Sequence, residues 1–308
     1  MKNKTIISIC GALIITLMMG CIEKFDADFD EMITEGLVIE GNIISDSTVV
    51  FQLSKTLPLD ITEDNADLFG SYLDVDAELA VKGSDGTSWP GYWRGKGKYG
   101  VEIGTLRPDV EYHLEILYNG DTYRSEPQKP LETIGIENLT FKQPNLDGPV
   151  SIQLDTEMGN GTQAAYFLWY FEEDWEVRTR LVTVDLFDPW TNRIIHYDYP
   201  PVAQGWCYRA TDQILLGTTE SNVENRMVGK TIQTIQNSDE RLSVLYSIRL
   251  QQRTLSRQEY EYDQVQAKLN NEMGGLFTPQ PSELPTNITC SNHSRKVIGY
   301  VGCNMGVI

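Results

Sequence analysis

The feature that most constrains this 308-residue chain is the alternation of apolar and polar residues in short runs that end in turn signals. In the stretch VEYHLEILY, residues 110–118, an apolar or aromatic residue recurs at every second position. The side chains of a strand point alternately to its two faces, so this period of two places the apolar residues on one buried face. Asn119-Gly120 follows directly, and both residue types tolerate the positive φ angles of a tight turn. The stretch therefore predicts a β-hairpin.

The same pattern recurs upstream of this hairpin. The run DVDAELAVKG, residues 74–83, alternates in the same way, and Asp85-Gly86 then supplies a second hairpin turn. Short strands with no helical pattern between them favour a β-sandwich. The phrase TLRPDVEYHLEI also resembles the corner of fibronectin-type sandwiches, which a tyrosine, here Tyr112, braces. We expect an immunoglobulin/fibronectin-like β-sandwich over residues 33–130.

Residues 131–308 are expected to form a second β-rich domain. Pro127 and Pro130 each remove a backbone donor, so they mark an extended connector between the two domains. Beyond the connector, the run AAYFLWYFEEDWEVRT is rich in aromatic and β-branched residues, a composition typical of strands. The whole chain is therefore predicted to be mostly β.

One amphipathic helix is predicted near the C-terminus, over residues 256–273. Ser256 is a suitable N-cap, and Glu259 three residues later completes a capping box. Glycines follow the helix where a C-cap is expected. The apolar stripe at helical spacing consists of Tyr262, Val265, Leu269 and Met273.

The N-terminus has the pattern of a bacterial lipoprotein signal. Two lysines open the chain, an uncharged apolar run extends over residues 5–19, and a small residue, Gly20, comes directly before Cys21. About 15 apolar residues suit a secretory signal better than a membrane span, which needs roughly 20. We expect residues 1–20 to be removed and Cys21 to carry lipid. The alternatives are an uncleaved anchor helix and a signal that is cut elsewhere.

An acidic tether, residues 21–32, follows the lipid site. Asp26, Asp28, Asp30 and Glu31 lie within ten residues of Cys21. Two interpretations are open: a solvated spacer, and a signal that directs the lipoprotein to the outer surface of the cell. The latter favours an outer-membrane protein that faces the cell exterior.

The formal charge of −19 limits the classes of partner. Nucleic acid demands clustered lysine and arginine, so we expect no nucleic-acid partner. A chain this acidic is repelled by an anionic lipid surface, so we expect it to contact the membrane through the N-terminal lipid alone.

Three cysteines remain after Cys10 is removed with the signal and Cys21 is acylated. Because three is odd, at most one disulfide forms and one thiol is left over. Cys303 lies in the apolar stretch VIGYVGCNMG and is expected to be a buried small residue. Cys207 with Cys290 is the preferred pair.

The sequence offers no catalytic residues, metal ligands or cofactor motif that can be singled out. The three histidines, His113, His196 and His293, do not form a metal-binding spacing. GKGKYG, residues 95–100, matches a dinucleotide-binding motif in letters, but a strand-like run follows it where a helix is required. Acids between residues 60 and 67 could ligate Ca²⁺, although a solvated loop explains them better.

Aromatic residues in the second half are the candidate contact residues. Aromatic side chains stack on sugar rings and anchor protein interfaces, but in a strand-rich domain they also form the core. Both interpretations stay open at this stage. The candidates for contact with a ligand or a partner are Trp175, Trp190, Tyr197, Tyr199 and Trp206.

Taken together, these segments resemble a known family. The family is that of the Bacteroidetes outer-membrane lipoproteins described as domain of unknown function 4249. The segments that resemble it are the opening GLVIEGNIISDSTVVFQLSKT, the phrase GWCYRA, the helix start LSRQEYEY, the turn GLFTPQP and the strands NITC and KVIGYV. The resemblance implies an outer-membrane lipoprotein found alongside TonB-dependent transporters, with no established catalytic residues. It also implies the pairing of Cys207 with Cys290.

We therefore expect a non-catalytic accessory component of a TonB-dependent nutrient uptake system, which binds either its transporter or a glycan or peptide ligand. Two alternatives from other classes stay open. A surface hydrolase acting on glycan or peptide would show a cleft in which carboxylates of shifted pKa face each other. A structural subunit of an envelope assembly would show a large flat apolar patch.

Overall fold

The computed structural model describes residues 36–56, 72–73, 75–159, 164–179, 183–199, 204–211, 213–222, 224–272 and 284–308. The sequence predictions that fall outside these residues are the signal peptide 1–20, lipidation of Cys21, the acidic tether 21–32, the acids between 60 and 67, and the end of the helix at Met273 with the glycines after it.

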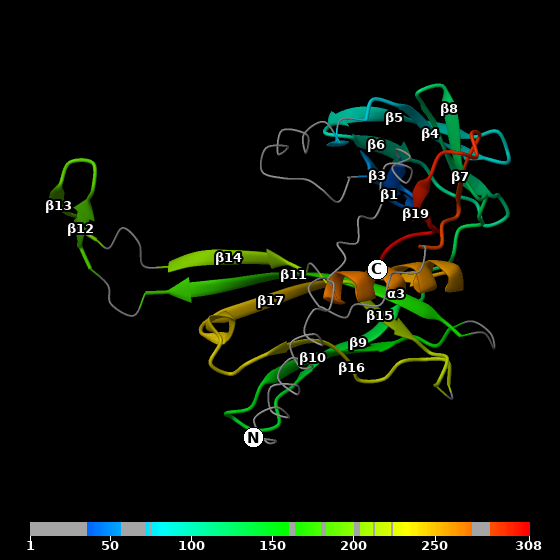
Figure 1. Cartoon of the computed structure of the whole chain (residues 1–308). Coiled ribbons are helices and arrows are strands. Elements are labelled where there is room, and N and C mark those ends of the chain that lie inside the picture. The colour runs from blue at the N-terminus through cyan, green and yellow to red at the C-terminus, as the bar shows by residue number, and fades with distance from the viewer. Residues whose placement is uncertain are drawn as a thin grey trace, which may run out of the picture. The chain divides into compact units, whose positions relative to one another are not determined.

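The described chain is mostly β, as the sequence predicts, and its largest element is a nine-stranded sheet (Figure 1). The strands follow the order β18-β8-β7-β4-β5-β6-β3-β1-β19, and β5 joins the two halves because it pairs with both β4 and β6. The two hairpin turns are confirmed: Asn119 and Gly120 have φ angles of 51° and 82°, and Gly86 has 89°. The strands are β1 (Leu37–Glu40), β3 (Ser47–Lys55), β4 (Glu78–Gly83), β5 (Ser88–Gly95), β6 (Lys98–Ile103), β7 (Tyr112–Tyr118), β8 (Asp121–Ser125), β18 (Ile288–Cys290) and β19 (Val297–Tyr300).

The core of this sheet follows the alternation in the sequence. Val110, Tyr112, Leu114 and Ile116 are all buried. The hydroxyl of Tyr112 accepts a hydrogen bond from the backbone N–H of Arg107 at 3.0 Å, which confirms the predicted tyrosine corner.

The C-terminal strands complete the sheet that the N-terminal strands begin. In Figure 1 the red β19 lies beside the blue β1, and the two strands pair in parallel with Leu37 opposite Val297. At the other edge, β18 pairs with β8, while β2 (Ile43–Ile44) and β20 (Cys303–Asn304) form a small parallel pair. The expected division at residue 130 did not include these pairings, which join residues 284–308 to the first sheet.

The rest of the described chain forms a second β region with its own core. A three-stranded sheet has the order β16-β10-β9, and a four-stranded sheet is built around β11, which pairs with β14, β15 and β17. Leu154, Phe167, Trp169, Phe171 and Ile232 pack together in one buried cluster. The strands are β9 (Ile136–Lys142), β10 (Val150–Thr156), β11 (Tyr166–Arg178), β14 (Gln204–Ala210), β15 (Leu215–Thr218), β16 (Lys230–Ile235) and β17 (Leu245–Leu255), with a short 3₁₀ helix η2 (Glu240–Leu242) before β17.

The predicted helix is present as α3 (Arg257–Glu272). The Ser256 hydroxyl accepts a hydrogen bond from the N–H of Glu259 at 3.1 Å, so the N-cap is confirmed. The Glu259 half of the capping box is wrong, because this carboxylate instead accepts a hydrogen bond from Arg253 at 2.5 Å. Of the predicted stripe, Tyr262 is buried and Val265 and Leu269 are half-buried, whereas Met273 lies outside the described residues.

Candidate binding surface

One face of the sheet around β11 carries exposed aromatic side chains. Cross-strand partners in a sheet point to the same side, and Trp206 lies opposite Glu176 while Tyr208 lies opposite Asp174. Trp206 is 60% exposed and Tyr208 is 59% exposed. We name this surface the aromatic face: Tyr170, Glu172 and Asp174 of β11, Trp206 and Tyr208 of β14, and Leu245 and Arg249 of β17.

Charged groups on the aromatic face hold its aromatic side chains in place. Glu172 accepts a hydrogen bond from the Tyr208 hydroxyl at 3.1 Å and another from Arg249 at 3.4 Å. Desolvation, followed by this contact with Glu172, raises the pKa of Tyr208 to about 12, so its hydroxyl stays a donor at neutral pH. The surface therefore offers apolar rings together with fixed hydrogen-bonding groups.

The opposite side of the same strands is buried and anchors them. Glu173 is fully buried and accepts hydrogen bonds from Arg241 at 3.0 Å and from the Tyr246 hydroxyl at 2.6 Å. Arg209 of β14 lies 2.6 Å from the same carboxylate, so this ion pair ties β14 to β11. A buried charge is tolerated when it is paired and hydrogen-bonded, as it is here.

Trp175 belongs to this buried side, where it is 8% exposed. Its interpretation as a contact residue is therefore wrong, because β11 alternates and Trp175 points away from the aromatic face. The sequence could not predict that Trp175 is buried, because its two neighbours, Asp174 and Glu176, are acidic residues of a kind usually found at the surface.

A separate hairpin presents the remaining candidates. Strands β12 (Asp185–Asp188) and β13 (Arg193–His196) pair with each other, and Trp190 in their turn is 95% exposed. Asp188 accepts hydrogen bonds from the Trp190 N–H at 3.0 Å and the Thr191 hydroxyl at 2.6 Å, so the turn is fixed. Tyr197 and Tyr199 are also exposed.

The structure divides the candidate aromatics between two surfaces, and it shows further exposed apolar side chains that the sequence analysis did not single out. These are Tyr208, Phe187 and Ile194, of which Tyr208 shares the period of two with Trp206. The hairpin and the aromatic face are linked through residues outside the described part of the chain, so the two surfaces stand as separate candidates.

The expected disulfide is not formed in the structure. Cys207, Cys290 and Cys303 are free thiols. Cys207 lies opposite Trp175 in the four-stranded sheet, whereas Cys290 lies opposite Tyr123 at the edge of the nine-stranded sheet. Cys303 is buried, as predicted, and burial raises the pKa of its thiol to about 12.

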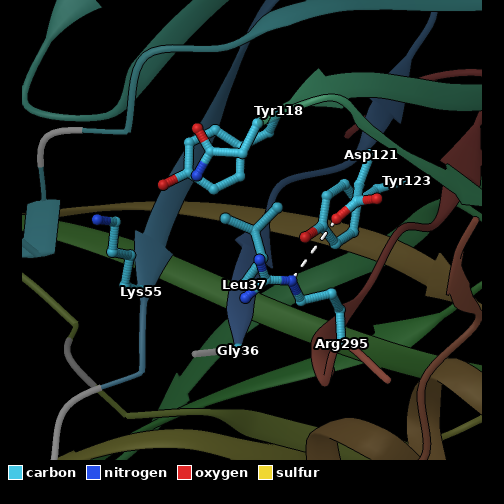
Figure 2. A pocket seen from close by; sticks show the side chains of 8 residues that line it. Gly36, Leu37, Lys55, Tyr118, Asp121, Tyr123 and Arg295 are labelled. Atoms are coloured by element: carbon cyan, nitrogen blue, oxygen red, sulfur yellow. Dashed lines mark ion pairs between the residues drawn. The ribbon is translucent and has the colours of Figure 1, made fainter. Parts of the chain in front are cut away.

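A small cavity opens near the edge of the nine-stranded sheet, where Leu37 of β1 and Tyr123 of β8 contribute to its wall (Figure 2). Its volume of about 10 Å³ is near the minimum for a single water molecule. The ion pair drawn in Figure 2 joins Arg295 to Asp121 over 3.6 Å and links the β18–β19 connection to β8. This cavity is therefore too small for an organic ligand.

Within the described ranges, no three histidine, cysteine or acidic side chains gather as metal ligands do. No helix in the same part of the chain is long and apolar enough to cross a membrane.

Comparison with known proteins gives one family. No curated protein matches the sequence. The model of the family described as "Domain of unknown function (DUF4249)" matches residues 22–304, which is nearly the whole chain, and the protein therefore belongs to this family.

Proposed function

We propose that this protein is a non-catalytic lipoprotein of the outer membrane that serves a TonB-dependent nutrient uptake system by binding its transporter or its ligand. Cys21 would carry the lipid, and the folded part would face the cell exterior. The N-terminal signal pattern and the family resemblance support the location. The aromatic face supports the binding role.

The observation that supports the binding role is the exposure of Trp206 and Tyr208 on β14, a strand that a buried ion-pair network on the opposite side of the sheet holds in place. Tryptophan, tyrosine and arginine dominate the energetics of protein contacts, and aromatic rings also stack on sugars. The buried Glu173 network fixes β14 before any partner arrives, so little ordering entropy is lost on binding. Carboxylates of Glu172 and Asp174 interrupt the apolar surface, which favours a polar-rimmed contact over the continuous apolar patch expected of an assembly subunit.

The test is affinity purification of the lipidated protein from native membranes, with mass spectrometry of what copurifies. The wild-type protein is expected to bring down a TonB-dependent barrel in stoichiometric amount. The double variant Trp206→Ala/Tyr208→Ala should lose at least nine-tenths of that barrel, because it removes both exposed rings. The matched control is Tyr92→Ala/Trp93→Ala, which removes a similarly exposed pair from β5 of the other sheet.

Two results would contradict the proposal. Recovery of the wild-type protein alone, in a screen that also finds no glycan or peptide bound, would remove the binding role. Equal loss of the barrel in both double variants would show that the aromatic face is not the contact. The lipid anchor is tested in the same cells, since Cys21→Ala should abolish incorporation of labelled palmitate while Cys10→Ala should not.

A further inference from the structure

A second cleft lies at helix α3, apart from the aromatic face. Its volume is about 260 Å³, slightly below the usual size of small-molecule sites. The walls come from the end of β1 and the residues after it, from β11, from the residue before β15, from β17, from α3 and from β19. The charged and aromatic residues of its lining are Glu40, Arg253, Glu259, Tyr262, Asp263 and Tyr300.

The cleft holds charges that are withdrawn from solvent. Glu259 is 3% exposed and Arg253 is 8% exposed. The Nη1 atom of Arg253 donates to Glu259 at 2.5 Å and to the side-chain oxygen of Asn304 at 3.2 Å. The one cation in the lining is therefore already committed to partners inside the protein.

Asp263 is the group that this arrangement leaves unmatched. Its Oδ2 atom is buried and has no hydrogen-bond partner within the described part of the chain. More than nine-tenths of buried polar groups in proteins have such a partner, so an exception at the wall of a cleft points to a molecule from outside.

The net charge of the lining indicates that a bound molecule should carry a positive charge. Glu40, Glu259 and Asp263 are acidic and Arg253 is the single base, so the lining has a formal charge of −2 when all four are ionised. The rings of Tyr262 and Tyr300, whose centroids are 5.8 Å apart, form an aromatic wall. Ring faces attract cations, and a buried carboxylate oxygen accepts hydrogen bonds from a positively charged donor.

We propose that the α3 cleft binds the primary ammonium group of a small organic molecule, with Asp263 as its counter-ion. A metal ion fits less well, because no group of three metal-ligating side chains is found among the described residues. The ammonium group can belong to a free amine or to the amino terminus of a short peptide, two sources with the same chemistry.

The proposal predicts a dependence on pH. Burial, and after it the nearby Glu259, raises the pKa of Asp263 to about 7, while Arg253 opposes this shift. The other ionisable groups that face the cleft are Glu40 of β1, Tyr262 of α3 and Tyr300 of β19. Since the ammonium group pairs with the ionised carboxylate, affinity should rise about tenfold between pH 6 and pH 8.

The experiment is calorimetric titration of the full mature protein in detergent with butylammonium, and with 1-butanol as the neutral probe of similar size. Saturable binding of butylammonium is expected, with 1-butanol binding at least tenfold more weakly. Asp263→Asn keeps the size of the side chain and should weaken butylammonium binding at least tenfold. Asp147→Asn, which removes an equal charge from an exposed position between β9 and β10, should leave it unchanged.

A trialanine amide with a free or an acetylated amino terminus then separates the two sources. Tighter binding of the free terminus than of butylammonium assigns the cleft to peptides, and the reverse assigns it to free amines. The proposal is overturned if the wild-type protein binds no butylammonium, if 1-butanol binds equally well, or if Asp263→Asn and the change of pH leave the affinity intact. It stands or falls independently of copurification with a transporter, because none of its residues belongs to the aromatic face.

Discussion

Trp175 and Trp206 lie on paired neighbouring strands, yet one is buried and the other is exposed. The register explains the difference, because Trp206 lies opposite Glu176 and so points to the side of β11 that Trp175 does not. Composition cannot separate two such residues, since the neighbours of both are acidic or small. The sequence predicted the role of a residue correctly where that role depends on residues close to it in the chain. Tyr112, which bonds to the N–H of Arg107, and Asn119, which forms a hairpin turn, are two such residues.

At the same scale, Glu115 joins three strands through its charge. Its carboxylate accepts hydrogen bonds from Lys82 of β4, at 2.5 Å, and from Arg124 of β8. The hydrogen bond from Lys82, followed by that from Arg124, lowers the pKa of Glu115 to about 2. The folded state therefore holds its proton more weakly than the unfolded state, whose pKa is near 4.3.

We predict that Glu115→Gln lowers the free energy of unfolding by about 1 kcal/mol at pH 7, a value reduced for the exposure of Lys82 and Arg124. A carboxylate whose pKa is lower in the folded state stabilises that state at pH values above the pKa of the unfolded state. The difference in unfolding free energy between the wild-type protein and Glu115→Gln should therefore shrink as the pH falls from about 5 to about 2. Urea unfolding at several pH values measures it. Glu102→Gln, an exposed carboxylate on β6, is the control and should change stability by less than about 0.5 kcal/mol. A Glu115→Gln effect that does not vary with pH would contradict the account.

At the scale of elements, two side chains just before β18 join it to the end of β19: the Thr286 hydroxyl donates to the Gly299 carbonyl at 2.7 Å, and Asn287 bonds to the backbone of Val301. Asn287 is buried, and its amide donates to the Val301 carbonyl at 2.9 Å while its carbonyl oxygen accepts from the Val301 N–H at 3.0 Å. The side chain thus makes the two bonds that a neighbouring strand would make. This role gives a physical reason for the asparagine in the stretch NITC. In the sequence alone, that stretch was only one of the segments that resemble the family.

We predict that Asn287→Ala destabilises the protein by roughly 1–3 kcal/mol, because the buried Val301 N–H loses its partner and the Val301 carbonyl keeps only the Gln128 amide at 3.2 Å. Thermal or urea unfolding checks this value. Thr289→Ala, two residues along on the exposed side of β18, should cost under about 0.5 kcal/mol. Equal effects of the two substitutions would show that the Asn287 side chain does not join the sheet.

Helix α3 shows where element-level prediction succeeds and where it ends. The cap, the apolar spacing and the glycines gave its position to within a residue, since these signals are local. The partner of Glu259 was missed, because Arg253 reaches it only after β17 and α3 have packed together. For the same reason, the α3 cleft has no signature in the sequence: its walls come from segments more than 200 residues apart.

At the scale of the whole molecule, the two ends of the described chain form one sheet. The parallel pairing of β1 with β19 brings Leu37 to Val297, a long-range contact that no local pattern announces. The fold class could be predicted because alternation and turns recur throughout the chain. The division into consecutive domains missed this pairing because it treats neighbours in sequence as neighbours in space.

We predict that residues 36–133 do not fold alone, since both edges of the sheet would lose their strands. The same segment joined to residues 284–308 by a flexible linker of about 20 residues, with a typical span of roughly 25 Å, should unfold cooperatively. Calorimetry of the two proteins checks this expectation. Cooperative unfolding of residues 36–133 without the C-terminal segment would show that β18, β19 and β20 are not needed.

We proposed above that the aromatic face contacts the transporter or the ligand of this protein, and photo-crosslinking in living cells is the measurement to make first. A photoreactive phenylalanine derivative replaces Trp206 in one strain and Trp93 of β5 in another, since both side chains are about half exposed or more. The account predicts a crosslinked adduct with a TonB-dependent transporter, or with its ligand, at position 206 and none at position 93. No adduct at 206, or the same adduct at both positions, would contradict it.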